Sequence, residues 1–260
     1  MAMSVTTCLA PLFVPADRPE RFAKAATSGA DAVILDLEDA VAPASKGAAL
    51  LALRADFTEV PIIVRINAAG TSWHDADIAA VSGLPVAAIM LPMAERPEDV
   101  ARVARCKPVI ALVETVAGMA AARDIARCGA AARLAFGSVD YAADLGCDHV
   151  RDALAAARAE MVFASRLGNL PAPLDGVTTD VGDGAAAADD ARHAASIGFG
   201  GKLAIHPRQI AVIRDAFVPS ADAIDWALRV LDSGDGVAVV DGKMVDEPVR
   251  IRARKILARR

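Results

Sequence analysis

The sequence predicts an α/β protein, a (β/α)8 TIM barrel followed by a small C-terminal helix–hairpin–helix lid. Short β-rich apolar runs alternate with alanine-rich amphipathic stretches, which is the rhythm of a parallel sheet with crossover helices. Eight such runs can be counted, most of them separated by one helix, and a closed barrel explains eight strands better than an open sheet does. Polar side chains also follow several of the runs, as barrel enzymes require.

The predicted strands are residues 8–14, 32–37, 62–66, 87–91, 109–113, 134–136, 169–173 and 202–205. The predicted helices between them are residues 19–28, 46–57, 75–81, 97–105, 116–128, 149–167 and 184–197. The seventh strand is the weakest, because Pro171 and Pro173 each remove a ladder donor. We include it because the strand count requires it and because Asp175 would follow its C-terminal end.

The rhythm changes after Pro207. A helix over 208–216 closes the predicted barrel domain, which spans residues 1–218. Residues 219–260 form the predicted lid or oligomerisation appendage: a helix to about Leu231, a hairpin around the Asp241-Gly242 turn, and a last helix from about Pro248. This appendage is too small to hold a core alone, so we expect it to pack on its own barrel or on a neighbour.

The composition excludes several classes of protein. Hydrophobic residues make up 55% of the 260 residues, yet Asp, Arg or Lys interrupts every apolar run before the roughly 18–20 residues of a spanning helix. The net charge is −5, and Lys and Arg cluster only in the last few residues, so neither a membrane nor a nucleic acid is an expected partner. Four scattered cysteines indicate neither a disulfide framework nor a zinc site. The first residues lack the pattern of a secretory signal, so the expected location is cytoplasmic.

Polar side chains stand where five of the predicted strands end. In a barrel, the carboxyl ends of the strands and the loops after them form the active site, so these side chains are expected at one mouth. They are Asp36, Glu38 and Asp39 after the second strand, Arg65 and Asn67 at the third, Glu114 at the fifth, Asp140 after the sixth, and His206-Pro207 after the eighth.

Glu114 and Asp140 are the predicted metal ligands. Two carboxylates from adjacent strands, without His or Cys, form a hard oxygen site that suits Mg2+ with several waters retained, whereas zinc prefers nitrogen or sulfur. Glu38 and Asp39 are predicted to support the metal-bound waters from behind. The alternative is that each carboxylate only caps the segment that follows it.

Arg65 and His206 each carry two interpretations. The planar fork of Arg65 suits bidentate binding of a substrate carboxylate or an enolate oxygen, or else Arg65 is an ion-pair partner of Glu38 or Asp39. His206 is either a general base or a residue that shapes the turn after the eighth strand. The absence of G-x-G-x-x-G, Walker A and G-x-S-x-G patterns disfavours a dehydrogenase, an NTPase and a serine hydrolase.

Seven motifs in collinear order resemble the citrate lyase beta-subunit-like branch of the HpcH/HpaI aldolase superfamily. They are VPADRPER at 14–21, LDLEDAV at 35–41, RIN at 65–67, ETxxG at 114–118, FGSxD at 136–140, IHP at 205–207 and GKMVDxP at 242–248. The resemblance implies a Mg2+-dependent barrel that acts on acyl-CoA thioesters and assembles as a homotrimer or a multiple of it.

The resemblance also assigns roles to residues. It implies that Glu114 and Asp140 bind the metal and that Asp246 belongs to a C-terminal lid that enters the active site of a neighbouring subunit. The alternative for Asp246 is an N-cap of the last helix. The implied substrate- and CoA-binding set is Arg18, Arg65, Glu114, His206 and Pro207.

The function that follows is cleavage of a short 3-hydroxyacyl-CoA, of the citramalyl-, malyl-, citryl- or hydroxymethylglutaryl-CoA type, to a keto product and acetyl-CoA through an enolate. Mg2+ and Arg65 would stabilise the developing oxygen charge, and Asp246 would protonate the enolate carbon. The chain is shorter than true citrate lyase beta subunits, which favours a stand-alone enzyme. The alternatives are a CoA-independent pyruvate aldolase and a non-catalytic subunit that needs partner proteins. Glu114 and Asp140 on opposite faces of the barrel would favour a non-catalytic subunit.

Overall fold

The computed structural model describes residues 5–258, and the chain divides into two compact units between Arg214 and Asp215. The division falls inside a helix, whereas the sequence placed the domain boundary after residue 218, where that helix has ended. Residues 1–4 and 259–260, which belong to the predicted barrel and lid ranges, lie outside the described residues.

The first unit is a closed barrel of eight parallel strands in sequence order. The strands are β1 (Leu12–Pro15), β2 (Val33–Asp36), β3 (Ile62–Arg65), β4 (Ala88–Leu91), β5 (Val109–Val113), β6 (Ala131–Phe136), β7 (Leu174–Asp175) and β8 (Gly201–Lys202). The ring closes where Leu12 forms a parallel bridge with Ala204, and the Phe13 N–H donates to the Ala204 carbonyl at 2.9 Å. The predicted α/β barrel is therefore confirmed.

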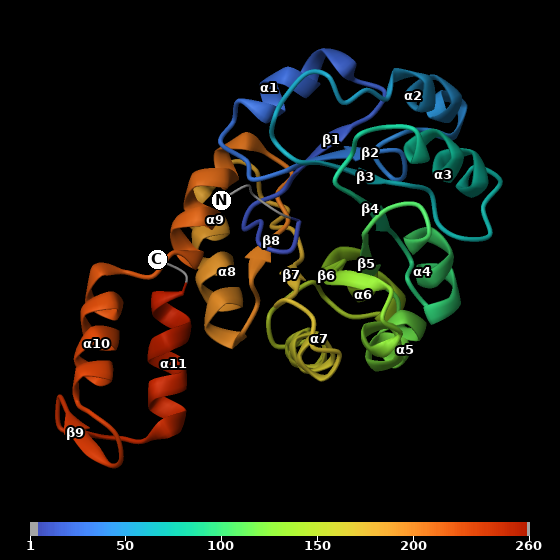
Figure 1. The fold of residues 1–260 in the computed structure, drawn as a ribbon. Coiled ribbons are helices and arrows are strands. Elements are labelled where there is room, and N and C mark those ends of the chain that lie inside the picture. Colours follow the sequence, from blue (N-terminus) through green and yellow to red (C-terminus); the bar gives the residue numbers. More distant parts are fainter. Residues whose placement is uncertain (1–4, 259–260) are drawn as a thin grey trace. The chain divides into compact units, whose positions relative to one another are not determined.

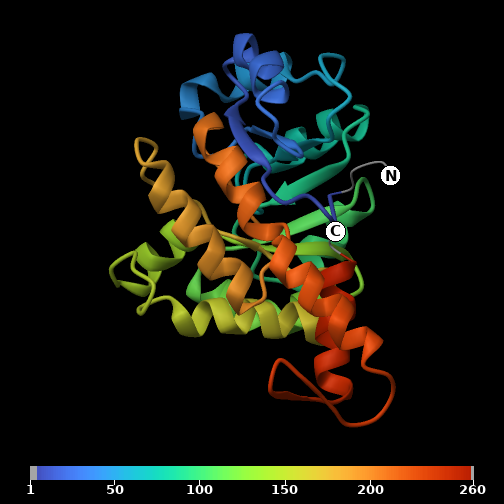
Figure 2. The same ribbon diagram turned by 90° about the vertical axis from the view of Figure 1, so that its left-hand side faces the viewer.

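The helices of the first unit lie outside the strands, as Figure 1 shows. They are α1 (Phe22–Ala26), α2 (Lys46–Ala52), α3 (His74–Ser82), α4 (Pro97–Ala104), α5 (Val116–Arg127), α6 (Ser138–Leu145), α7 (Ala155–Leu167), α8 (Gly184–Ile197) and α9 (Ile210–Phe217). Three short 3-10 helices, η1 (Pro19–Arg21), η2 (Pro43–Ser45) and η3 (Pro207–Gln209), precede α1, α2 and α9. The side view in Figure 2 shows the same arrangement, with the helices outside and the strands within.

Several elements differ from the sequence prediction. The seventh strand lies at Leu174–Asp175 and not at 169–173, because its prolines cannot donate to a ladder and pairing begins only after Pro173. The first strand is Leu12–Pro15 rather than residues 8–14, and the eighth is Gly201–Lys202 rather than residues 202–205. Helix α6 was not predicted, because its residues directly follow a strand and contain no apolar run of their own. Helix α7 begins at Ala155 rather than at residue 149.

The interior of the barrel is filled by aliphatic side chains that point inward from the strands. This layer includes Ile34, Ile63, Met90, Ile110, Leu112, Leu174 and Leu203. Below it, the fully buried Arg133 from β6 donates to the carbonyls of Cys8 at 2.8 Å, Val5 at 3.2 Å and Ala172 at 2.8 Å. Arg133 thereby ties the N-terminal segment to the sheet and closes the end of the barrel opposite the C-terminal ends of the strands.

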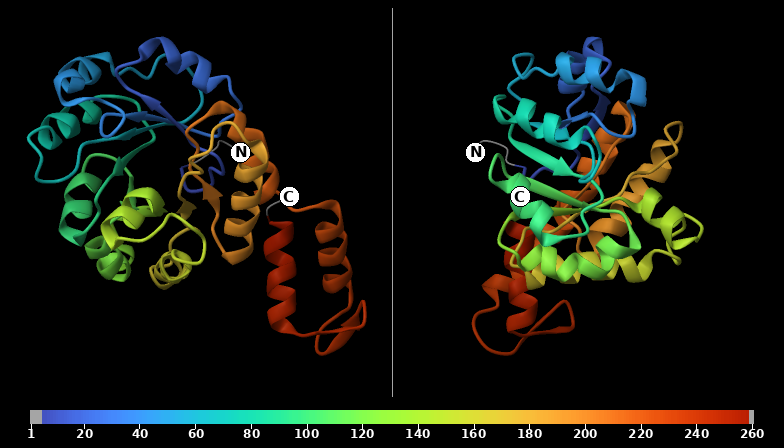
Figure 3. Two further views of the ribbon diagram at one scale, coloured as in Figure 1. Left: turned by 180° about the vertical axis from the view of Figure 1, so that it is seen from behind. Right: turned by 90° about the vertical axis from the view of Figure 1, so that its right-hand side faces the viewer.

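The second unit consists of α10 (Ala221–Asp232), the hairpin β9 (Ala238–Val240) and β10 (Lys243–Val245), and α11 (Glu247–Leu257). Figure 3 shows α10 and α11 side by side with the hairpin at one end. Asp241 and Gly242 both have positive φ, 51° and 72°, as a two-residue hairpin turn requires. The predicted helix–hairpin–helix is confirmed. Across residues 5–258, no helix has both the length and the hydropathy to cross a membrane.

Candidate active site at the barrel mouth

Five of the predicted residues, Asp36, Asp39, Arg65, Glu114 and Asp140, line one cavity of about 460 Å³ at the C-terminal ends of the strands. The lining does not include Arg18, Glu38, His206, Pro207 or Asp246. Its polar lining comes from Asp36, Asp39, Arg65, Glu114, Ser138, Asp140 and Thr179. Its apolar lining comes from Phe13, Leu112, Phe136, Val139, Val177, Leu203 and Ile205, together with Ala40 and Gly137. Glu114 and Asp140 therefore share one cavity, and the condition that would have favoured a non-catalytic subunit is not met.

Arg65 and Asp36 form the closest ion pair of this cavity. They end adjacent strands and are register partners, so their side chains leave the sheet side by side. Arg65 donates from Nε to Asp36 Oδ1 at 2.7 Å and from Nη2 to Asp36 Oδ2 at 2.7 Å, a bidentate geometry. Asp36 also accepts the backbone N–H groups of Glu38 at 2.9 Å and Ala40 at 3.1 Å. Asp36 thus both caps the loop after β2 and fixes the orientation of the guanidinium.

The third nitrogen of Arg65 faces two more carboxylates. Nη1 lies 2.9 Å from Glu38 Oε2 and donates to Asp39 Oδ2 at 3.3 Å. The guanidinium also stacks on Phe13, 4.8 Å from the ring centroid. The ion-pair interpretation of Arg65 is therefore realised in this structure, with Asp36 as the main partner that sequence reasoning did not select. The neighbouring carboxylates raise the pKa of Arg65 against the effect of burial, so it remains charged.

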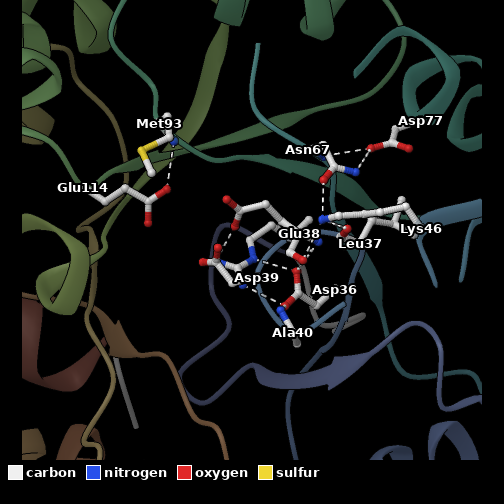
Figure 4. Close-up of polar contacts among 11 residues, drawn as sticks. Asp36, Leu37, Glu38, Asp39, Ala40, Lys46, Asn67, Asp77, Met93 and Glu114 are labelled. Carbon is white, nitrogen blue, oxygen red and sulfur yellow. Dashed lines mark hydrogen bonds and ion pairs between the residues drawn. The ribbon is translucent and has the colours of Figure 1, made fainter. Parts of the chain in front are cut away.

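Glu114 follows β5 directly and is 1% exposed. The Met93 N–H donates to its Oε1 at 2.8 Å, from a backbone with a φ of 46° that is rare for a side chain such as methionine. Figure 4 shows this contact, together with the separate group of carboxylates formed by Asp36, Glu38 and Asp39. A Cβ on Gly137 would lie 2.4 Å from both Cβ and Oε2 of Glu114, so the glycine leaves the space that this side chain occupies.

Around Arg65 the site holds more negative than positive charge. The carboxylates are Asp36, Glu38, Asp39, Glu114 and Asp140, all of them near the single guanidinium. Burial raises the pKa of Glu114 to about 8, and Glu38 and Asp140 add to the rise. Burial also raises the pKa values of Glu38 and Asp140, with Asp39 contributing to each. A cation bound beside these carboxyl groups would lower their pKa values again.

That donor set fits Mg2+. The candidate ligands are carboxylate oxygens without His or Cys ligands among them, and burial together with neighbouring carboxylates raises their pKa values. Such a hard oxygen site suits Mg2+. Within the described part of the chain, no three Asp, Glu, His or Cys side chains converge as a complete ligand set. A magnesium ion on Glu114 and Asp140 would accordingly keep several waters, as this ion commonly does.

The residues that the resemblance assigns to CoA lie beside the same mouth. Arg18 follows β1 and is 56% exposed, while His206 and Pro207 follow β8, the neighbour of β1 in the closed ring. His206 is the N-cap of η3, and its Nδ1 accepts the Arg208 N–H at 3.2 Å. This contact realises the turn-shaping interpretation of His206, and Ile205 is the residue of this turn that lines the cavity.

Asp246 lies in the second unit, at the start of α11. Its Oδ1 accepts the Val249 N–H at 3.3 Å, so Asp246 is the N-cap of this helix. The sequence left this N-cap role open as the alternative for Asp246. The cap uses one of the two carboxylate oxygens.

Sequence reasoning missed the polar cluster behind Glu38. The buried Lys46 Nζ donates to the carbonyls of Leu37 and Glu38, each at 2.8 Å, and to Asn67 Oδ1 at 2.6 Å. Asn67 in turn donates to Asp77 Oδ2 from its backbone at 2.8 Å and from its amide at 2.6 Å, as Figure 4 shows. This cluster holds the acidic loop after β2 in place. The available signal was Asn67, two residues after Arg65, whereas Lys46 resembled an ordinary helix residue.

Comparison with known proteins agrees with this geometry. The model of the HpcH/HpaI aldolase/citrate lyase family matches residues 9–207. The chain is 42% identical to a citrate lyase subunit beta-like protein of Mycobacterium tuberculosis over 95% of this chain and 94% of that protein. It is 34% identical to a (3S)-malyl-CoA thioesterase of Cereibacter sphaeroides, over 95% and 93% of the two chains.

A solved structure is similar over the whole length. The crystal structure of the protein CitE from Mycobacterium tuberculosis, in complex with magnesium, acetoacetate and coenzyme A, superposes with a TM-score of 0.88 at 39% identity and covers 98% of this chain and 99% of that one. The barrel, the acidic mouth and the matches over nearly the full sequence lead to one conclusion: this chain is an enzyme of the HpcH/HpaI aldolase/citrate lyase family.

Proposed function

We propose that this protein is a Mg2+-dependent carbon–carbon lyase that cleaves a short 3-hydroxyacyl-CoA thioester to a keto product and acetyl-CoA. The observation that carries the proposal is the mouth of the barrel, where five carboxylates surround one guanidinium beside an apolar wall. That arrangement suits a bound cation and a small acyl group. The family membership and the relative that binds magnesium, acetoacetate and coenzyme A support it.

Glu114 and Asp140 are the residues that would hold Mg2+, which supplies positive charge to oxygens that become negative during cleavage. Arg65, fixed by Asp36, would present its guanidinium edge to the substrate carboxylate or carbonyl oxygen. Breaking the C2–C3 bond leaves its electron pair on the thioester as an enolate, while C3 becomes a carbonyl. Protonation of the enolate at C2 then gives acetyl-CoA, and we assign that proton to Asp246.

CoA binding would involve Arg18 and the His206-Pro207 turn, because these residues flank the mouth at adjacent strand ends. The assembly that goes with this proposal is a homotrimer or a multiple of it, in which Asp246 serves a neighbouring barrel. Light scattering coupled to size-exclusion chromatography would measure the mass, and a monomer at enzyme-assay concentration would contradict the assignment across subunits.

A second candidate is thioester hydrolysis, because one relative is a (3S)-malyl-CoA thioesterase. The two activities differ in their products. A lyase releases a keto acid and acetyl-CoA, whereas a thioesterase releases the hydroxy acid and free CoA.

The decisive experiment incubates the purified protein with citramalyl-, malyl-, citryl- and hydroxymethylglutaryl-CoA, with Mg2+ and with EDTA, and separates the products by chromatography. We expect EDTA-sensitive release of acetyl-CoA from at least one thioester. Free CoA without acetyl-CoA would favour the hydrolase, and cleavage of free hydroxy-keto acids without CoA would favour a pyruvate aldolase. Inactivity toward the whole panel would contradict the proposal.

A further inference from the structure

A serine–histidine pair connects the main cavity to a second one. Ser138 lines the main cavity, and its Oγ lies 2.9 Å from Nε2 of His149, within hydrogen-bond distance. His149 lines a separate cavity of about 300 Å³, whose other lining includes Arg158, Thr178 and Asp190. Thr179 borders both cavities. The Ser138–His149 hydrogen bond therefore runs from the acidic mouth to a neighbouring, partly polar space.

The fold holds Ser138 tightly. Ser138 is the first residue of α6 and is 1% exposed, and Gly176 packs its backbone against it. A Cβ on Gly176 would lie 2.1 Å from Ser138 Oγ, so a side chain at this position is incompatible with the serine. The hydroxyl is thus fixed between the loop after β7 and the imidazole ring of His149.

The surroundings of His149 favour its neutral form. Partial burial lowers the pKa of His149, and the cations of Arg158 on α7 and Lys202 on β8 lower it further, while Asp190 on α8 and Asp175 on β7 oppose them. Arg158 and Lys202 share the one carboxylate of Asp175, at 3.0 and 3.1 Å. A neutral imidazole can accept a proton, which an imidazolium cannot.

The proposed cleavage needs a base that the residues assigned so far do not supply. The proton of the substrate's 3-hydroxyl must leave as C3 becomes a carbonyl. Glu114 and Asp140 are assigned to the metal, and Arg65 is a permanent cation. The carboxylates of Asp36, Glu38 and Asp39 are ion-paired with Arg65. All four histidines lie within residues 5–258. His206 uses Nδ1 as a helix cap, the buried His74 directs Nδ1 to the Asn67 carbonyl, and His193 lines neither cavity. His149 is the histidine that contacts a residue of the main cavity, Ser138.

We propose that Ser138 accepts the 3-hydroxyl proton of the substrate while passing its own proton to Nε2 of His149, an assignment that rests on the lyase function proposed above. The O–H bond of the substrate breaks, the C2–C3 bond breaks with its electron pair moving to the thioester enolate, and C3 becomes the carbonyl carbon. His149, now an imidazolium, releases its proton to solvent before the next turnover. Ser138 is the catalytic group that contacts the substrate, and His149 acts through it as a positioning and relay residue.

The test compares Ser138→Ala and His149→Gln with matched variants outside both cavities. Ser165→Ala removes another buried serine hydroxyl, from α7, and His193→Gln removes a histidine from α8. We expect Ser138→Ala and His149→Gln each to lower kcat by about 10²-fold or more with KM little changed, and the double variant to be no slower than the slower single variant. The matched variants should retain kcat within about twofold.

Two further readouts separate a relay from a structural role. Mn2+ or Mg2+ affinity, measured by calorimetry, should be the same in wild type, Ser138→Ala and His149→Gln, and added imidazole should restore turnover to His149→Gly. Parallel loss of metal binding, failure of imidazole rescue, or an unchanged kcat in either variant would overturn the relay. If wild type itself cleaves no thioester of the panel, the lyase proposal fails, whereas activity that survives both substitutions removes only the relay.

Discussion

Arg65 and Asp36, opposite each other on neighbouring strands, share two hydrogen bonds of 2.7 Å at the floor of the acidic mouth. Asp36 is 1% exposed and Arg65 8% exposed, so the pair is largely shielded from water. Burying a charge is unfavourable unless it is paired and hydrogen-bonded, and here each partner satisfies the other. The orientation of the guanidinium is therefore set by the sheet register and not by a flexible loop.

Replacing Arg65 by Gln should destabilise the protein strongly. The substitution leaves Asp36, Glu38 and Asp39 without their shared cation, and breaking a buried ion pair costs about 3–5 kcal/mol. Urea unfolding of the metal-free protein measures the effect. Arg102→Gln is the control, because its pair with Asp75 is exposed and such pairs contribute at most about 1 kcal/mol. Equal losses in the two variants would show that the buried pair has no special weight.

The stability of the metal-free protein should fall as pH rises. Glu114 has a folded-state pKa of about 8, above its ordinary value near 4.5, so the native state binds its proton more tightly than the unfolded state does. The stabilisation is fully present below pH 4.5 and is lost as pH approaches 8, by up to about 1.4 kcal/mol per pH unit for one group. The melting temperature should therefore be higher at pH 5.5 than at pH 8, in an experiment with EDTA present.

Saturating Mg2+ should reduce that pH dependence, because the ion replaces the proton on Glu114. The variant Glu114→Gln should show a shallower slope than wild type without metal and a smaller response to Mg2+. A metal-free melting temperature that stays constant from pH 5.5 to 8 would contradict the charge deficit inferred for the mouth.

Gly137→Ala should impair metal binding. The added Cβ would lie 2.4 Å from the Cβ and Oε2 atoms of Glu114, so the carboxylate must move. We expect Mg2+ affinity, measured by calorimetry, to fall by about tenfold or more. Gly47→Ala in α2 is the matched control, because nothing lies within 4 Å of its added Cβ. That variant should gain about 0.5–1 kcal/mol of stability and bind Mg2+ normally. Normal binding by Gly137→Ala would remove Glu114 from the ligand set.

Asp246→Asn separates the two roles of this residue. Asparagine caps a helix as well as aspartate does, so α11 and the melting temperature should be preserved, while an amide cannot donate a carboxyl proton. Turnover should fall by about 10²-fold or more. Ser220→Ala, which removes the N-cap of α10, is the reverse control, with about 1 kcal/mol lost and turnover retained. Full turnover by Asp246→Asn would leave this residue as a helix cap only.

The barrel was predictable because its signal is repeated. Apolar runs such as Val109–Val113 and Ile62–Arg65 are read correctly almost to the residue, since a strand buried on both faces has no polar interruption. The prediction failed where pairing is minimal. The strand Leu174–Asp175 has two residues, and its position depends on the proline before it and on the neighbouring β8, neither of which produces an apolar run.

The site was predictable to the level of strand ends and no further. Glu114, Asp140 and Arg65 could be placed at one mouth because parallel strands end together. The pairing of Arg65 with Asp36 rather than chiefly with Glu38 or Asp39 depends on register, which no local pattern specifies. Ser138 begins α6 and His149 follows the end of that helix, while Lys46 of α2 reaches Asn67 after β3. Neither contact has a sequence spacing that reveals it.

The hydrogen bonds of Arg133 to the carbonyls of Val5, Cys8 and Ala172 have a consequence for how the chain folds. Its hydrogen bond to the Cys8 carbonyl joins residues 125 positions apart, and the backbone N–H of Lys202 donates to the Leu9 carbonyl at 2.8 Å. Contacts of such sequence separation form late, because a long loop must close before they are made. During synthesis, the first strand therefore cannot pair with the eighth until most of the barrel has been made. Until then its unpaired edge and apolar face are exposed to chaperones and to neighbouring chains.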